Sequence, residues 1–360
     1  MPDSAEAATP RRSWVLHVDL DQFIAAVEVL RRPELVGLPV VVGGDGDPSK
    51  RGVVSTASYE AREFGVGSGM PLRTAARKIP DAVFLPVDRE AYDEASAGVM
   101  QVLRSTGVPV EVLGWDEAFM GVETDDPEAF ARDLLEAILD ETRLHASVGI
   151  GDNKLRAKIA TSFGKPRGMY RLTEENWFEV MGDRPTDALW GIGRKTARRL
   201  AELGIHTVHD LAGTDTARLA GEIGPTMGPW YRRLGRGADS SPVDATPYVA
   251  RGHGRETTFQ ENLTDWSDVE SETRKLAAQV TEDIRREGRP AVRVGMKMRY
   301  APFETRHRSL TLDAPAADEA TITDAALTLL GRFDTSRAVR LLGVRAEMSP
   351  PEQPAGVTGP

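Results

Sequence analysis

The sequence contains no cysteine, only six histidines and no long hydrophobic run. The lack of cysteine excludes disulfides, thiol catalysis and thiolate zinc sites. With so few histidines, we expect any metal to be a hard cation held by oxygen ligands. No apolar segment approaches the roughly 18 residues that a transmembrane helix needs. Residues 1–12 lack the apolar core of a signal peptide, so we expect a cytoplasmic protein.

The net charge of −10 is unevenly distributed. Residues 13–166 carry 25 acidic and 16 basic side chains, a net of −9. Residues 167–244 carry 11 of each sign and residues 245–349 carry 16 of each sign. The acidity therefore lies where metal-binding carboxylates would be needed, and phosphate contact in the second half depends on local patches. A neutral module is equally compatible with no nucleic-acid role, so charge alone does not decide the function.

Apolar runs and turn residues predict alternating strands and helices over the first 165 residues. The expected strands are 14–19, 38–42, 53–55, two within 108–120, and 147–150. The expected helices are 22–31, 59–64, 91–105, 127–142 and 154–163. This order indicates an α+β domain with a carboxylate-bearing sheet.

The second half has a different pattern. Residues 170–238 lack strand signals and predict short helices, and residues 240–248 are a candidate linker. The expected order beyond the linker is strand 254–260, helix 266–287, strands 291–300 and 306–313, helix 318–333 and strand 338–348. This βαββαβ order indicates a small two-layer domain. The Pro/Gly-rich tail, 350–360, is expected to be disordered.

Three carboxylates are the candidate catalytic groups. Asp19 is expected to end a buried strand and Asp21 to open a helix, where backbone N–H groups favour phosphate. Asp116 and Glu117 are adjacent within an apolar strand pair, where uncompensated burial is costly. Taken singly, these acids could be a helix N-cap and a solvated turn. Together, three carboxylates on the strand ends of one sheet can hold two divalent cations.

Basic groups that could bind phosphate surround these acids in the sequence. Tyr59 and Arg62 share one face of a helix, and Arg62 offers a planar fork to phosphate oxygens. Lys165, in a group with Lys154 and Lys158, lies just past a helix end, from which its ammonium could reach an anion in the carboxylate cleft. The alternatives are a surface arginine above a packed tyrosine and ordinary helix capping by a cation.

Residues 189–205 have the pattern of a helix-hairpin-helix. Gly191 and Gly193 permit a tight hairpin whose N–H groups can face a phosphate. Positive charge follows directly, from Arg194, Lys195, Arg198 and Arg199. Such a module binds the DNA backbone without regard to sequence. The alternative is a structural turn between helices.

The order and spacing of these motifs resemble the Y-family translesion DNA polymerases, polymerase IV branch, over about residues 14–348. The motifs are Val18-Asp-x-Asp-x-Phe23, Tyr59-Glu-Ala-Arg-x-Phe-Gly-Val66, Asp116-Glu-Ala118, Lys165-Pro-x-Gly168 and Gly191-Ile-Gly-Arg-Lys-Thr196. The resemblance implies a right-hand fold. Its parts would be a palm (13–22 and 88–166), fingers (23–87), a thumb (167–239), a linker (240–248) and a little finger (249–349).

The resemblance also implies roles for individual residues. Asp19, Asp116 and Glu117, with the Leu20 carbonyl, would bind two Mg²⁺ ions, for which Mn²⁺ could substitute. The triphosphate would be held by Tyr59, Arg62 and Lys165, with Thr56 nearby and the Phe23 and Ile24 amides. Val53 and Ser55 would lie over the nascent base pair. The hairpin at Gly191–Gly193, with Arg194 and Lys195, would hold the primer. The little-finger residues expected to face template phosphates are Arg255, Arg293, Lys297, Arg306 and Arg308.

Three departures from the family pattern stand out. Ile24 replaces the Tyr or Phe whose ring excludes a 2′-hydroxyl, so we expect weak discrimination against ribonucleotides unless the β-branched chain fills the gap. Gly114-Trp115 replaces Ser and an aliphatic residue, which indicates altered packing beneath the metals. The tail 350–360 lacks the usual sliding-clamp peptide, so we expect weak clamp binding or another recruitment route.

The predicted function is low-fidelity, template-directed DNA synthesis from nucleoside triphosphates onto a primer 3′-hydroxyl. Primer–template DNA and nucleotides would be the partners, and the protein would be a monomer that acts on the nucleoid. The main alternative is a non-catalytic DNA-binding protein of the same fold, although the three intact acids argue against it. A nucleotidyl cyclase is a more distant alternative, since it has no use for a basic hairpin.

Overall fold

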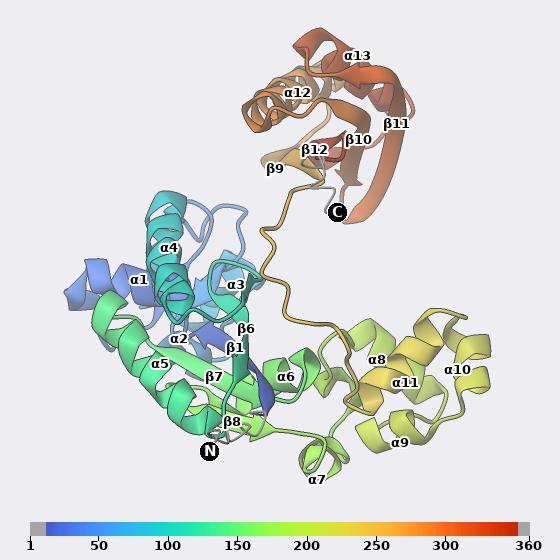
Figure 1. The fold of residues 1–360 in the computed structure, drawn as a ribbon. Coiled ribbons are helices and arrows are strands. Elements are labelled where there is room, and N and C mark those ends of the chain that lie inside the picture. The colour runs from blue at the N-terminus through green and yellow to red at the C-terminus, as the bar shows by residue number, and fades with distance from the viewer. Residues whose placement is uncertain (1–11, 352–360) are drawn as a thin grey trace, which may run out of the picture. The chain divides into compact units, whose positions relative to one another are not determined.

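Three separate β-sheets organise the chain in this computed structural model, which describes residues 12–351 (Figure 1). The described residues divide into two units, with the boundary between Pro247 and Tyr248. The second unit also takes in the short segment Pro48–Arg51.

The largest sheet of the first unit has the strand order β5-β6-β1-β7-β8. Its strands are β1 (Ser13–Leu20), β5 (Val110–Val112), β6 (Glu117–Glu123), β7 (Ala146–Gly151) and β8 (Met169–Leu172). Helices α4 (Arg89–Ser105) and α5 (Pro127–Thr142) pack on one face and share a core with alternate β1 residues: Trp14, Leu16, Val18 and Leu20. Helix α6 (Lys154–Gly164) covers the opposite face, towards which His17 points.

A close backbone approach seats α6 on this sheet. At Gly149 in β7, a Cβ atom would lie 1.9 Å from the Ala157 carbonyl oxygen and 2.4 Å from the Thr161 amide nitrogen. Only glycine allows this contact between strand and helix. The helix is thereby brought close to β1, the neighbouring strand, whose penultimate residue is the candidate metal ligand Asp19.

A second, small sheet has the order β3-β2-β4 and lies in the range assigned to the fingers. Its strands are β2 (Val40–Val42), β3 (Thr56–Ala57) and β4 (Val83–Leu85). The helices of this range are α1 (Phe23–Arg31), the 3₁₀ turn η1 (Pro33–Leu35), α2 (Tyr59–Glu63) and α3 (Leu72–Lys78). Buried side chains around Val41, Ala61 and Leu72 form its own core.

Residues 173–238 fold into short helices, as expected. They are α7 (Trp177–Met181), η2 (Thr186–Ala188), α8 (Arg194–Glu202), α9 (Val208–Gly213), α10 (Thr216–Ile223) and α11 (Met227–Gly235). Their apolar faces share one core with Leu155, Ile159 and Ala160 of α6.

The second unit holds a four-stranded antiparallel sheet of order β11-β10-β12-β9 with two helices on one face (Figure 1). Its elements are β9 (Gly252–Leu263), α12 (Trp266–Glu287), β10 (Ala291–Tyr300), β11 (Glu304–Ala316), α13 (Glu319–Leu330) and β12 (Val339–Met348). The predicted βαββαβ order and α+β class are therefore confirmed. The expected disordered tail lies, from residue 352 onward, outside the described residues.

Some local predictions were wrong. The strand expected at 53–55 is β3 at Thr56–Ala57, and Val53 forms only an isolated bridge with Pro71. Strand β8 lies where no strand was expected, because four residues at a sheet edge carry little sequence signal. Helix α3 and strand β4 were not anticipated. Asp21 does not open α1, which begins at Phe23 after Gln22 in a left-handed conformation (φ 45°).

Candidate active site

The three predicted catalytic carboxylates lie together at one end of the large sheet. Asp19 of β1 pairs in register with Glu117 of β6, so both side chains leave the same face. The Leu20 amide donates a 2.8 Å hydrogen bond to the Asp116 carbonyl, which fixes the turn before β6 against β1. The sequence prediction that these acids share strand ends of one sheet agrees with this register.

Glu117 is held by groups beneath it. Lys158 of α6 forms an ion pair with Glu117 Oε2, and His17 Nε2 lies 3.3 Å from the same oxygen. The other ring nitrogen of His17, Nδ1, lies 2.8 Å from Thr161 Oγ1. The hydrogen bond with His17, helped by Lys158, lowers the pKa of Glu117 to about 2, so this carboxylate is ionised at neutral pH. Burial lowers the pKa of His17 and favours its neutral form.

Asp116 is in the opposite electrostatic situation. Burial raises the pKa of Asp116, and the negative charges of Asp19 and Glu117 raise it further. The three acids are therefore close enough to repel one another. Such a cluster is stabilised by a cation, and its donor atoms are all oxygen.

Two lysines provide positive charge at the acids. Lys165 pairs with Asp19, as Lys158 pairs with Glu117. Across residues 12–351, no three acidic, histidine or cysteine side chains have metal-ligand geometry in this arrangement. The carboxylates and the Leu20 carbonyl nevertheless fit a divalent cation, because all of them are hard oxygen donors. At Asp116, the negative charges of Asp19 and Glu117 act more strongly than the positive charge of Lys165.

A cavity of about 300 Å³ opens beside the acids. Nine of the twelve predicted active-site residues line it: Asp19, Leu20, Phe23, Ile24, Ser55, Thr56, Arg62, Asp116 and Lys165. Glu117, Tyr59 and Val53 are not among its lining residues. Three further residues line it that were not among the predicted site residues: Gln22, Ser68 and Trp115.

Asp21 ties Tyr59, one of the predicted phosphate ligands, to the sheet. Its buried carboxylate accepts hydrogen bonds from the Tyr59 hydroxyl (2.7 Å), from Ser147 Oγ (3.1 Å to each oxygen) and from the Arg167 amide (2.7 Å). Gln22 accepts a hydrogen bond from the Tyr59 amide. The Asp21 carboxylate is therefore occupied by three segments, which explains why it does not cap α1.

Arg62 is oriented in the same region. Its Nε donates a 2.9 Å hydrogen bond to the Ala57 carbonyl, and its guanidinium lies 5.0 Å from the centre of the Tyr59 ring. Arg62 is also one of the residues that line the cavity. Arg62 and Lys165 thus line one space of suitable charge for a triphosphate, and Tyr59 lies behind Arg62.

The side of the cavity near Ile24 has an unusual wall. Ile24 is 9% exposed, and Trp115 packs against the same apolar core. Trp115 is fixed by its Nε1 hydrogen bond to Asp93 (2.7 Å) and by the Arg89 guanidinium 5.1 Å from the ring centre. The rigid indole of Trp115 therefore lines the pocket. In the family that the sequence resembles, this pocket has an aromatic residue at the position of Ile24.

The predicted hairpin at Gly191–Gly193 lies between η2 and α8. Gly191 has a φ of 96°, and a Cβ atom there would meet Trp230 at 2.8 Å, so glycine is required for both conformation and space. Ile192 is buried, whereas Gly191, Gly193, Arg194 and Lys195 are exposed. The turn and the start of α8 thus present backbone N–H groups and two cations to the surface.

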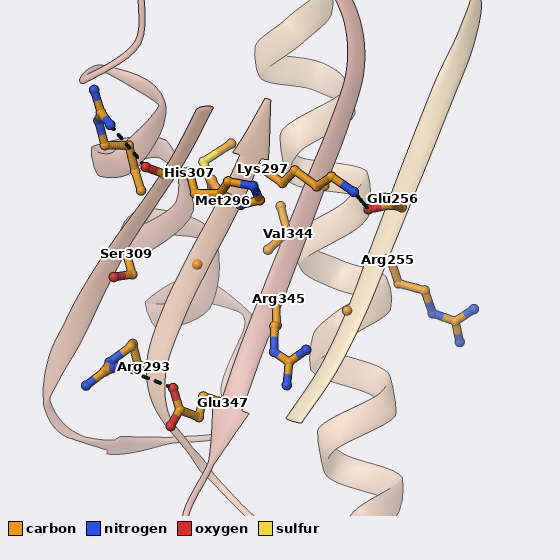
Figure 2. Close-up of a pocket in the computed structure, with 14 residues that line it drawn as sticks. Arg255, Glu256, Arg293, Met296, Lys297, His307, Ser309, Val344, Arg345 and Glu347 are labelled. Atoms are coloured by element: carbon orange, nitrogen blue, oxygen red, sulfur yellow. Dashed lines mark hydrogen bonds and ion pairs between the residues drawn. The ribbon is translucent and has the colours of Figure 1, made fainter. Parts of the chain in front are cut away.

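The open face of the second unit's sheet carries the other basic cluster (Figure 2). A hollow of about 690 Å³ lies on this face, with Arg293, Lys297 and Arg345 around it. In register across the strands, Gly254 and Gly295 flank Arg345, and Gly343 lies between Glu256 and Lys297. The glycines leave space between the cations, so a phosphate backbone could approach the sheet closely. Arg345 was not singled out in the sequence.

Three of the five predicted little-finger contacts lie on the other face. Arg255 pairs with Val344 in register, and Arg308 and Arg306 pair with Met296 and Met298, all core residues. Paired residues of antiparallel strands point to the same side, so these arginines leave the sheet on its helix side. Arg255 forms two hydrogen bonds with Asp283 of α12, at 2.6 and 2.7 Å. Although Arg255 and Arg308 are among the residues that line the hollow, the register directs these three side chains away from Arg293 and Lys297, and their contact with template phosphates stays a prediction.

Because Arg255 and Arg345 lie on different faces of the sheet, replacing each of them should change a different property of the protein. Replacing Arg255 with Ala should lower the free energy of unfolding of the second unit by about 1–2 kcal/mol at neutral pH, because it leaves Asp283 nearly buried and unpaired. The hydrogen bond from Arg255 lowers the pKa of Asp283 below its ordinary 3.8. The stabilisation is therefore present above pH 3.8 and is lost as the pH falls below it. Urea denaturation at several pH values measures both effects.

Arg345→Ala is the matched variant for that experiment. We expect it to leave stability almost unchanged, to weaken DNA binding several-fold and to reduce the salt slope of binding by about one. Arg255→Ala should leave both DNA measurements near those of the wild type. If Arg255→Ala weakens DNA binding as much as Arg345→Ala, the assignment of Arg255 to the helix side is contradicted.

Comparisons with known proteins identify the family. Residues 18–162 match the impB/mucB/samB family, and residues 250–356 match the C-terminal domain of that family. The chain is 49% identical over 346 residues to DNA polymerase IV 2 of Mycobacterium tuberculosis (strain ATCC 25618 / H37Rv), covering 95% of this chain and 99% of that protein. It is 38% identical over 339 residues to DNA polymerase IV of Methanoculleus marisnigri, covering 93% and 94%.

Solved structures agree with these relatives. The Y-family DNA polymerase chimera Dbh-Dpo4(243-245)-Dbh is similar with a TM-score of 0.83 and 27% identity, over 93% of this chain and 98% of that one. An insertion ternary complex of Dbh DNA polymerase is similar with a TM-score of 0.65, 27% identity and the same coverage.

The fold, the carboxylate-bearing sheet and these matches define a Y-family DNA polymerase. The chain belongs to that family, in its polymerase IV branch. It is a DNA-directed DNA polymerase of the translesion class, as the motif resemblance predicted. No helix within residues 12–351 has the length and apolar character needed to cross a bilayer.

Proposed function

We propose that Asp19, Asp116 and Glu117 catalyse nucleotidyl transfer from a nucleoside triphosphate to a primer 3′-hydroxyl. The observation that supports this most directly is the convergence of three acids beside a cavity that also contains Arg62 and Lys165. The two divalent cations held there, Mg²⁺ or Mn²⁺ in its place, would activate the hydroxyl and neutralise the triphosphate. Leu20 would add its carbonyl oxygen to the donor set.

The residues around the acids would position the nucleotide. Tyr59, Arg62 and Lys165 would bind the β- and γ-phosphates, with Thr56 and the Phe23 and Ile24 amides completing the cradle. Binding a triphosphate would draw Lys165 from Asp19 to phosphate oxygen and release that carboxylate for the metal. Val53 and Ser55 would lie over the new base pair. Of these two residues, Ser55 lines the cavity.

Primer extension with Mg²⁺ and with Mn²⁺ tests the proposed chemistry. Template-directed extension by the wild-type protein supports it. Binding of primer–template without any extension would instead favour the alternative of a non-catalytic DNA-binding protein.

We further propose that the substrate DNA is held at two surfaces. Gly191, Gly193, Arg194 and Lys195 would grip the primer backbone as part of a helix-hairpin-helix. Arg293, Lys297 and Arg345 would contact template phosphates on the open face of the sheet. Both surfaces would bind the negatively charged DNA backbone without contacting base edges, which suits an enzyme that must accept damaged templates.

Two acids on the open face would compete with DNA phosphates for these cations. Glu256 Oε2 lies 2.8 Å from Lys297 Nζ, and Glu347 Oε2 lies 3.5 Å from the Arg293 guanidinium (Figure 2). Replacing both with Gln should tighten binding of primer–template about three- to tenfold at low salt and steepen its salt dependence, because two phosphate ligands lose competing carboxylates. Fluorescence anisotropy over a salt series measures this.

Glu282→Gln is the matched control, since Glu282 pairs with Arg286 on α12 and not on the open face. It should leave DNA affinity unchanged. Equal affinity of the wild type and the Glu256/Glu347 double variant would show that the open face does not carry the DNA.

The predictions of weak clamp binding through residues 350–360, of a monomer and of action on the nucleoid depend on the sequence and remain predictions. Co-elution with the sliding clamp at micromolar concentration would contradict the first of them.

A further inference from the structure

Trp190, next to the proposed primer-binding hairpin, reaches into the support of a catalytic carboxylate. It immediately precedes Gly191, and its ring contacts Phe119 of β6 edge-on, with 6.4 Å between ring centres and 63° between planes. The Lys158 ammonium nitrogen lies 5.4 Å from the centre of the Trp190 ring. Trp190 is 46% exposed, so this contact does not result from general burial of the indole.

Lys158 connects the indole to Glu117. An ammonium has three hydrogen-bond donors, and in Lys158 two of these directions face Glu117 Oε2 and His17 Nε2, the latter 3.1 Å away. The ring of Trp190 provides a negative face for the remaining side of the cation. By fixing Oε2 of Glu117, Lys158 also fixes the direction of the second carboxylate oxygen, which is the one left for a metal.

We propose that Trp190 is a positioning residue that holds Lys158 on Glu117, so that metal binding and catalysis depend on how the hairpin is seated. This inference rests on the proposed roles of Glu117 and the hairpin. When the primer backbone seats the hairpin, the indole stays over Lys158 and Glu117 keeps its orientation. If the hairpin shifts, the ammonium loses one of its three neighbours and Glu117 is less well held. A displaced primer would thereby slow nucleotidyl transfer as well as weaken the binding of the DNA.

The test compares Trp190→Leu, which keeps an apolar side chain without a π face, with Trp190→Phe, which keeps the face. Single-turnover primer extension should fall about tenfold for Trp190→Leu and stay within about twofold of the wild type for Trp190→Phe. The affinity for primer–template should change by less than about twofold in both. Binding of Mn²⁺ to the enzyme with primer–template and a non-hydrolysable nucleotide, followed by electron paramagnetic resonance, should weaken only for Trp190→Leu.

A double-mutant cycle with Lys158→Met separates this role from simple packing of the thumb. In the Lys158→Met background, Trp190→Leu should cost no further rate, because its effect acts through Lys158. Additive losses for Trp190→Leu, or equal rates for the Leu and Phe variants, would overturn the proposal.

The controls also separate this inference from the proposed function. If the wild-type protein does not extend primers, the proposed catalytic site fails. If the wild type is active and Trp190→Leu matches it in rate and Mn²⁺ binding, only the role of Trp190 fails.

Discussion

Replacing Asp116 with Asn should reduce the rate of primer extension by about 10³–10⁴-fold while the protein stays folded. The side chains have nearly the same shape, but the amide carries no charge and offers one fewer oxygen to a divalent cation. Burial raises the pKa of Asp116 and repulsion from Asp19 and Glu117 raises it further, so removing its charge relieves both costs in the free protein. The variant should therefore unfold at a temperature equal to or above that of the wild type. Single-turnover extension and thermal unfolding measure the two effects.

Glu123→Gln provides the matched control, because Glu123 lies at the far end of the same strand, β6, beside Ser13. It should retain the wild-type rate. An Asp116→Asn protein with more than a tenth of the wild-type rate would contradict two-metal chemistry at this cluster. Full DNA affinity of that variant would show that the loss concerns the chemical step.

Replacing Ile24 with Phe should increase the preference for deoxyribonucleotides over ribonucleotides by about 10²-fold. Discrimination of this kind depends on steric exclusion of one hydroxyl, and a planar ring at position 24 would narrow the cavity beside the sugar more than an aliphatic side chain does. Because Trp115 already forms a rigid part of this wall, the added ring should close the space rather than displace its neighbour. The measurement is kcat/KM for each nucleotide, matched for the base.

Ile24→Leu is the control for a change of shape without a ring, and it should keep the wild-type ratio within a few-fold. If the wild type already rejects ribonucleotides as strongly as Ile24→Phe, then Ile24 with Trp115 excludes the hydroxyl and weak discrimination is the wrong prediction.

The parts of the site that could be predicted from the sequence are those whose geometry is local. Asp19, Asp116 and Glu117 sit on short segments whose strand character is evident from apolar neighbours, and pairing of such strands brings their ends together. Tyr59 and Arg62 share one helical turn. The family resemblance then supplied an order of motifs that single segments do not contain. Both the α+β class and the little-finger sheet were predictable on these grounds.

The parts that could not be predicted depend on register and on contacts between distant segments. Strands β9, β10 and β12 contain register shifts, and both faces of these strands carry arginine, so charge alone does not tell which side faces out. The pairing of Arg255 with Asp283 on the helix side was therefore not foreseen, and Arg345 was overlooked. The contact between Lys158 and Trp190 joins residues 32 apart through the packing of α6 against the following helices, for which the sequence has no marker. The cavity position of Trp115 likewise depends on Asp93 and Arg89 of α4.

The bonds that Asp21 and Gln22 make to Tyr59 have a consequence for accuracy. Many enzymes gain selectivity by an induced closure that only the correct substrate completes. Here one of the proposed phosphate ligands is already fastened to the sheet by its own hydroxyl and its own amide before any nucleotide arrives. A pocket assembled in advance has less closure left to make, and so has less opportunity to reject a mismatched or damaged pair at that step. The same two contacts that order the site thus leave fewer steps at which an incorrect base pair can be rejected.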